Sequence, residues 1–108
     1  MLNDPAYLEM AFGLAERMMS GGDAAVDRIQ HGFRLCVARK ASGNEVAVLA
    51  DVYQTELARL KANPKLANQL FKGVAEYSVQ AGVDRVELAA WFAVANTLLN
   101  LDETITNG

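Results

Sequence analysis

The segment from Glu87 to Thr106, ELAAWFAVANTLLNLDETIT, constrains the fold more than any other part of this chain. Large apolar residues recur in it at three- and four-residue spacing, which lines one face of an α-helix: Leu88, Trp91, Phe92, Ala95, Leu98 and Leu99. Val94 and Leu101 widen this stripe. Because such a wide stripe needs cover on more than one side, we predict that this helix lies at the centre of the fold.

The two ends of this helix differ in their polar residues. Asp84 as N-cap, with Glu87 at the third helical position, predicts an acidic capping box and a helix start near Arg85. At the other end, Asp102 and Glu103 fall where a helix carries partial negative charge, which costs ~0.3–1 kcal/mol per carboxylate. Either the helix stops before these two residues, or a cation lies beside them.

Capping residues, glycines and prolines divide the rest of the chain into four further helices. We expect them from Pro5 to Ser20, from an Asp23 cap to Arg39, from a Ser42 and Glu45 capping box to Ala62, and from Pro64 to just before Gly73. Between Gly73 and Val83 the pattern fits either a continued helix or a connecting loop, and we favour the loop.

These elements predict an all-α fold. We expect a single domain over residues 1–108, built as a compact array of about five helices, mostly antiparallel neighbours, around the central C-terminal helix. A chain of 108 residues buries enough surface to fold without disulfides or metals, and its single cysteine excludes an internal disulfide. The net charge of -3 and the pI near 5.0 argue against nucleic acid as a partner.

The residues that could carry chemistry fit structural roles better. Cys36 falls on an apolar helix face, whereas reactive thiols need a cationic, partly exposed setting. Asp27 and His31 lie one turn apart and could form a general base, but a surface ion pair fits this pattern better. Three methionines at helical spacing fit core filling better than an adaptable binding surface: Met10, Met18 and Met19.

Cofactor and metal sites are also disfavoured. Covalent haem attachment needs a Cys-x-x-Cys-His run, and Cys36 and His31 lie about 140° apart around a helix, so they cannot share a zinc ion on one face. Asp102 and Glu103, without further oxygen ligands, are a weak calcium signal. We therefore expect no cofactor, no metal site and no catalytic residue in this chain.

Basic residues precede the Ser42-capped helix and suggest a helix-turn-helix motif: Arg28, Arg34, Arg39 and Lys40. The following helix carries acidic residues and has its basic residues only at its far end, which is the wrong charge for DNA.

One polar group remains as a candidate network near the apolar stripe: Arg34, Asn96, Asn100 and Asp102. We predict that Arg34 reaches the end of the last helix and neutralises its negative charge. Simple solvent exposure of these side chains is the alternative.

Three stretches, in this order, resemble a known family: LNDPAYLEMAFGLAERMM, DRIQHGFRLCVARKASGNEVAVL, and ELAAW with VANTLLNLDETIT. They are similar to the closing part of the C-terminal domain of unknown function in planctomycete-type multidomain proteins, which often also carry a cytochrome c segment. The likeness spans nearly the whole chain, although Ala41 stands where the family often has proline. The resemblance implies part of a larger domain and assigns no catalytic residue.

Localisation and partners depend on this resemblance. Read alone, the chain has no apolar run of the ~18 residues that span a membrane and no signal-peptide pattern, which indicates a cytoplasmic protein. The resemblance instead implies an exported multidomain protein. The expected partners are other domains of that parent protein or further copies of this chain, because helix faces meant for a missing part would be exposed.

Two function classes are consistent with these features. The first, which we favour, is a non-catalytic helical structural or interaction module of a larger protein. The second is a small ligand-binding or enzyme domain whose site needs absent segments or a second subunit. A site domain predicts a deep polar pocket and strongly shifted titratable groups, whereas a module predicts neither.

Overall fold

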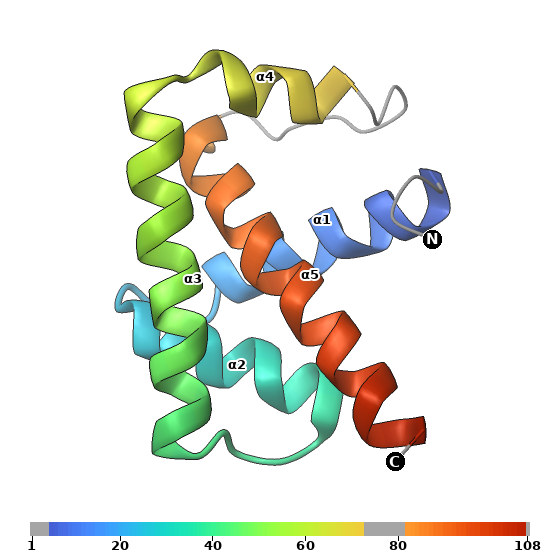
Figure 1. The fold of residues 1–108 in the computed structure, drawn as a ribbon. Coiled ribbons are helices and arrows are strands. Elements are labelled where there is room, and N and C mark those ends of the chain that lie inside the picture. The colour runs from blue at the N-terminus through green and yellow to red at the C-terminus, as the bar shows by residue number, and fades with distance from the viewer. Residues whose placement is uncertain (1–4, 73–81, 108) are drawn as a thin grey trace.

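The computed structural model describes residues 5–72 and 82–107, with only the backbone described for residue 5 and residues 102–107. Five α-helices follow one another: α1 (Pro5–Met19), α2 (Ala25–Val37), α3 (Gly43–Ala62), α4 (Lys65–Lys72) and α5 (Arg85–Asn107) (Figure 1). These residues contain no strand, so the prediction of an all-α fold is confirmed. Within the same residues, no helix is long and apolar enough to cross a membrane.

Helix α5 lies at the centre of the array, as its wide apolar stripe predicts. It contacts each of the other four helices, and its contacts with α1 and α3 are the most extensive. Figure 1 shows α3 and α5 running in opposite directions, with α4 across one end of the pair and α1 and α2 behind it. The buried residues of α5 accordingly lie between Leu88 and Leu98.

Aromatic side chains fill the centre of the core around α5. Trp91 is completely buried and stacks on Tyr53 of α3, with ring centroids 4.2 Å apart. Phe12 of α1 is also completely buried. Its ring centroid lies 4.5 Å from that of Phe92 of α5 and 5.1 Å from that of Phe71 of α4. Burying a side chain such as Phe12 stabilises the fold by roughly 1.5–3 kcal/mol. These contacts connect elements that lie far apart in the sequence.

Two glycines allow α1 and α2 to pack closely. A Cβ on Gly32 of α2 would lie 2.6 Å from the Met18 sulfur of α1, so only glycine fits there without moving that methionine. In the connection between the helices, Gly22 has a φ of +140°, a conformation that side chains rarely adopt. The first helix ends before these glycines as predicted, but its last residue is Met19 and not Ser20.

The predicted ends of the second helix are both wrong by a short distance. Its N-cap is Ala24, which makes no side-chain cap, and not Asp23. The Ala24 carbonyl accepts the Arg28 N–H at 3.2 Å, so the helical ladder begins after Asp23. At the other end Ala38 adopts a left-handed φ of 59° and donates its N–H to the Arg34 carbonyl at 3.0 Å, which ends the helix at Val37 and not at Arg39.

The other helix boundaries lie at or within one residue of their predicted positions, with α4 beginning at Lys65 and not at Pro64. Helix α3 begins after the Ser42 cap and ends at Ala62, and α4 stops at Lys72. Helix α5 begins at Arg85 and continues through residues 102 and 103, so the alternative in which it stops before Asp102 is wrong. The predicted loop from Gly73 to Val83 falls mostly on residues 73–81, which lie outside the described part of the chain.

Candidate functional site

Of the three ion pairs found among the described residues, the one between Arg28 of α2 and Glu87 of α5 contains the least exposed side chain. The two side chains are only 16% and 32% exposed, and their nearest N and O atoms are 2.6 Å apart. Arg28 also donates from Nε to the Gly22 carbonyl at 2.7 Å, and its guanidinium carbon lies 5.8 Å from the ring centre of Trp91. Arg28 thus joins the α1–α2 turn to the start of α5.

This ion pair changes the predicted capping box of α5. Asp84 caps the helix as predicted, because its Oδ1 accepts the Val86 N–H at 2.9 Å and the Glu87 N–H at 3.4 Å. The other half of the box needs Glu87 to reach back to Asp84, and the described residues show no such bond. Arg28 binds the Glu87 carboxylate instead.

Tyr53 and Trp91 lie beside this pair. Burial raises the pKa of the Tyr53 hydroxyl above its usual value, and the nearby negative charge of Glu87 raises it further. The Trp91 indole N–H is buried and has no hydrogen-bond partner among the described residues. Four of the grooves on the described surface are lined by residues other than these. Tyr53 and Trp91 are buried in the core, and Arg28 and Glu87 lie partly exposed at its edge.

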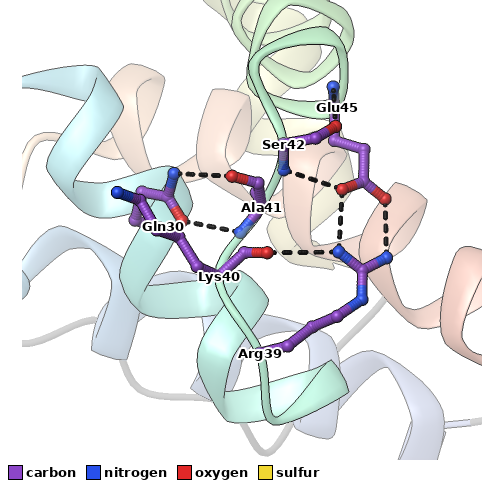
Figure 2. A network of polar contacts seen from close by, with 6 residues as sticks. All are labelled: Gln30, Arg39, Lys40, Ala41, Ser42 and Glu45. Carbon is purple, nitrogen blue, oxygen red and sulfur yellow. Dashed lines mark hydrogen bonds and ion pairs between the residues drawn. The ribbon is translucent and has the colours of Figure 1, made fainter.

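A second polar network joins α2 to α3 (Figure 2). The Gln30 side chain donates to the Ala41 carbonyl at 3.0 Å and accepts the Ala41 N–H at 2.8 Å. Ser42 and Glu45 form both halves of the predicted capping box, which is confirmed. Arg39 binds Glu45 through two hydrogen bonds of 2.9 Å. Together, Arg39 and the Ser42 backbone N–H lower the pKa of Glu45 to about 2.

The structure does not bring the predicted Arg34 network together through described side chains. Asn96 is half-buried and its Oδ1 accepts the Tyr7 hydroxyl at 2.7 Å, which connects α5 to α1. Arg34 and Asn100 are exposed. Arg34 makes no side-chain hydrogen bond or ion pair with any described side chain. The Asp102 side chain lies outside the described residues, so a contact between Arg34 and Asp102 stays a prediction.

Cys36 and His31 occupy structural positions. Cys36 is half-buried and packs against the core, as predicted. His31 is half-buried over Gly21, where an added Cβ would lie 2.6 Å from the His31 Cβ. Asp27 is exposed, and the described side chains include no hydrogen bond or ion pair between Asp27 and His31. This pair therefore shows neither the ion-pair geometry nor the geometry of an oriented general base.

The methionines differ in their burial. Met18 is fully buried and Met19 is half-buried, whereas Met10 is 53% exposed. Core filling therefore accounts for Met18 and not for Met10.

Two of the four basic residues near the Ser42 helix are held in ion pairs, Arg28 with Glu87 and Arg39 with Glu45. Arg34 and Lys40 are exposed. In the part of the chain that the structure describes, no group of three His, Cys, Asp or Glu side chains could hold a metal ion.

Three of the grooves on the described surface differ in character. The largest, of about 580 Å³, lies between α3, α4 and α5, and the charged residues on its rim, Glu56 and Arg59, bind each other at 2.8 Å. The smallest of the three, about 240 Å³, is almost entirely apolar and lies between the start of α3 and the later part of α5, beside the exposed Val48.

The third groove, which we call the α1 groove, has a volume of about 410 Å³ and is formed by α1, α2 and α5. It is lined by Glu9, Met10, Gly13, Leu14, Arg17, Leu35, Cys36 and Leu99. Two of the four large hydrophobic side chains that are exposed in the described structure lie here, Met10 at 53% and Leu35 at 47%. The sequence does not predict this surface, because both residues lie on or next to the apolar faces expected for their helices.

No protein-family model, curated protein or solved structure matches this chain. The resemblance to the planctomycete-type C-terminal domain therefore stays a prediction, and only the geometry and chemistry of the molecule itself can support a function.

Proposed function

We propose that this chain is a non-catalytic helical interaction module of a larger multidomain protein, and that it docks through the α1 groove. The family proposed for it is the planctomycete-type C-terminal domain of unknown function. The observation that supports docking is the exposure of Met10 and Leu35 on either side of one groove. Exposed apolar side chains that gather beside a hollow, with charged residues at its rim, are typical of protein interaction sites.

A non-catalytic role is supported by how the charged groups are used. Arg28 with Glu87 and Arg39 with Glu45 connect helices or cap them. The group with the most strongly lowered pKa, Glu45, is a capping residue on the surface. Enzymes instead place shifted groups in clefts where a substrate can reach them.

The docking surface can be tested with the hydrophobic dye 8-anilinonaphthalene-1-sulfonate. We expect saturable binding that shifts the methyl resonances of Met10 and Leu35, and we expect the double variant M10Q/L35Q to lose most of it. The variant V26Q/V48Q is a matched control, because Val26 and Val48 are 51% and 60% exposed on other parts of the surface. Dye binding that persists in M10Q/L35Q but is lost in V26Q/V48Q would place the docking surface elsewhere.

A second candidate function is a ligand-binding domain whose site is completed by other segments. The groove between α3, α4 and α5 favours it, because polar residues such as Gln69, Asn96 and Thr97 line it beside apolar ones. In the same resonance experiment, small polar ligands that shift Thr97 and Gln69 while leaving Met10 unchanged would support this alternative over the module.

A further inference from the structure

We propose that the α1 groove binds a second copy of this chain, with α1 crossing its own counterpart in antiparallel fashion at Gly13. This inference rests on the proposed function, since it names the occupant of the docking surface. Three features along the outer side of α1 support it: two opposite charges, the glycine between them, and the exposed apolar side chains beside them.

The outer side of α1 has a symmetric order of residues around Gly13. Glu9 lies four residues before Gly13 and Arg17 lies four residues after it, and all three line the α1 groove. At 1.5 Å per residue, each charge is about 6 Å along the helix axis from the glycine. Both charged residues are exposed, and no other described side chain forms an ion pair with either of them.

Gly13 provides the room for a close crossing. A Cβ at this position would meet no described atom within 4 Å beyond its chain neighbours and the backbone of its own helix, so packing among the described residues does not require a glycine here. Glycine within a helix costs roughly 0.5–1 kcal/mol relative to alanine. A helix surface without a side chain does, however, let a second backbone approach closely.

A two-fold axis through Gly13 makes this surface complementary to itself. In a symmetric dimer each contact occurs twice, because residue i of one copy meets residue j of the other. An antiparallel crossing at Gly13 sets Glu9 of each copy beside Arg17 of the other. Met10 and Leu35 then lose their solvent exposure against the second copy. The charge order of α1 is therefore complementary to a second copy of the same helix.

The first test is the concentration dependence of association, measured by sedimentation equilibrium from about 10 μM to about 1 mM, the range expected for a small interface. We expect reversible dimers of the wild-type chain. G13Q should weaken dimerisation at least about tenfold without lowering the melting temperature, because the monomer has room for a side chain there. The matched control is G43Q, since Gly43 is another helical glycine with open space around it, on α3.

Charge reversal tests the pairing of Glu9 with Arg17. E9R and R17E should each weaken dimerisation several-fold, because each change places like charges together twice. An equimolar mixture of E9R and R17E should dimerise again, because opposite charges then meet at both ends of the crossing. D51R is the control for E9R, since Asp51 is an exposed carboxylate on α3.

Two results overturn this proposal. The proposal is wrong if the wild-type chain stays monomeric up to about 1 mM. It is also wrong if G13Q and both charge reversals leave the dimer unchanged. If the hydrophobic dye still binds at Met10 and Leu35 in either case, the α1 groove takes another protein and the proposed function stands. If dye binding is also absent there, the proposed function fails as well.

Discussion

The starts of α3 and α5 use the same residue pattern in two different ways. Each helix has a capping residue, Ser42 or Asp84, followed three residues later by a glutamate, and each glutamate binds an arginine. At α3 the pattern is local, because Glu45 completes its own capping box and binds Arg39 six residues away. At α5 the arginine is Arg28, which lies 59 residues away in the sequence.

The two ion pairs also differ in their access to water. Arg28 is 16% exposed, whereas Arg39 is 48% exposed. A charge sheltered from water loses more when its partner is removed, because solvent cannot replace the lost hydrogen bonds. We therefore predict that loss of the arginine costs more stability at the start of α5 than at the start of α3, although the two glutamates are exposed to a similar extent, at 32% and 26%.

The largest expected effect is that of Arg28→Met. It removes the bond to Gly22 and the contact with Trp91, and it leaves the Glu87 carboxylate without its cation. We expect the free energy of unfolding to fall by about 2–3 kcal/mol. Urea denaturation followed by far-ultraviolet circular dichroism measures it. Arg28→Lys, which keeps the charge, should recover part of the loss.

A double-mutant cycle with Glu87→Gln separates the ion pair from the other contacts of Arg28. We expect Arg28→Met combined with Glu87→Gln to cost less than the sum of the two single changes, because the second change removes a charge that the first left unpaired. Strict additivity would mean that Arg28 acts through Gly22 and Trp91 and not through Glu87.

The next effect in size is the loss of each N-cap. Asp84→Ala removes the acceptor of two backbone N–H groups, and Ser42→Ala removes the acceptor of the Glu45 N–H. Each should lower the free energy of unfolding by about 1 kcal/mol. We expect the larger loss at Asp84, where the glutamate is bound elsewhere and does not complete a box. Asp84→Ser is the control, and a larger loss at Ser42 in the same denaturation experiment would contradict this order.

Local signals explain which parts of the fold were predictable. The Ser42 box, the start of α5 and the apolar stripe around Trp91 each depend on residues within a few turns of one another, and all three are confirmed. Asp23 is not the cap because the helical hydrogen bonds begin one residue later, at Ala24, in a turn that Arg28 holds through its bond to the Gly22 carbonyl six residues away. The capping preferences of single residues do not predict contacts of this kind.

The candidate sites were harder to predict than the helices. The sequence suggests Arg28 only as one basic residue of a helix-turn-helix motif, because no residue near it in the chain points to Glu87. The α1 groove was not predicted either, since Met10 and Leu35 look like ordinary members of amphipathic helices until packing shows which apolar residues remain outside the core. Which side chains three helices leave exposed depends on their crossing geometry, and a single sequence does not specify that.

A smaller effect is expected from pH, through Glu45. Its pKa in the folded chain is about 2, below its usual value of 4.5, so its contribution to stability is complete above about pH 4.5 and is lost as the pH falls towards 2. The difference in melting temperature between wild type and Glu45→Gln should therefore be constant near neutral pH and shrink between pH 4.5 and 2. Thermal denaturation at several pH values measures it. A difference that grows on acidification would contradict this sign.

The smallest effect on stability is expected from Arg39→Gln, and this change tests how much of the lowered pKa of Glu45 is linked to stability. The hydrogen bonds from Arg39 are the largest cause of the lowered pKa of Glu45, so that pKa should rise towards 4.5, while the Ser42 backbone N–H still holds it below that value. Carboxyl carbon resonances followed across the titration measure the shift. The melting temperature near neutral pH should fall only slightly, because solvent screens the exposed Arg39, and this fall should disappear as the pH approaches 2. If Arg39→Gln instead destabilises the chain as much as Arg28→Met does, then solvent exposure is not what distinguishes the start of α3 from the start of α5.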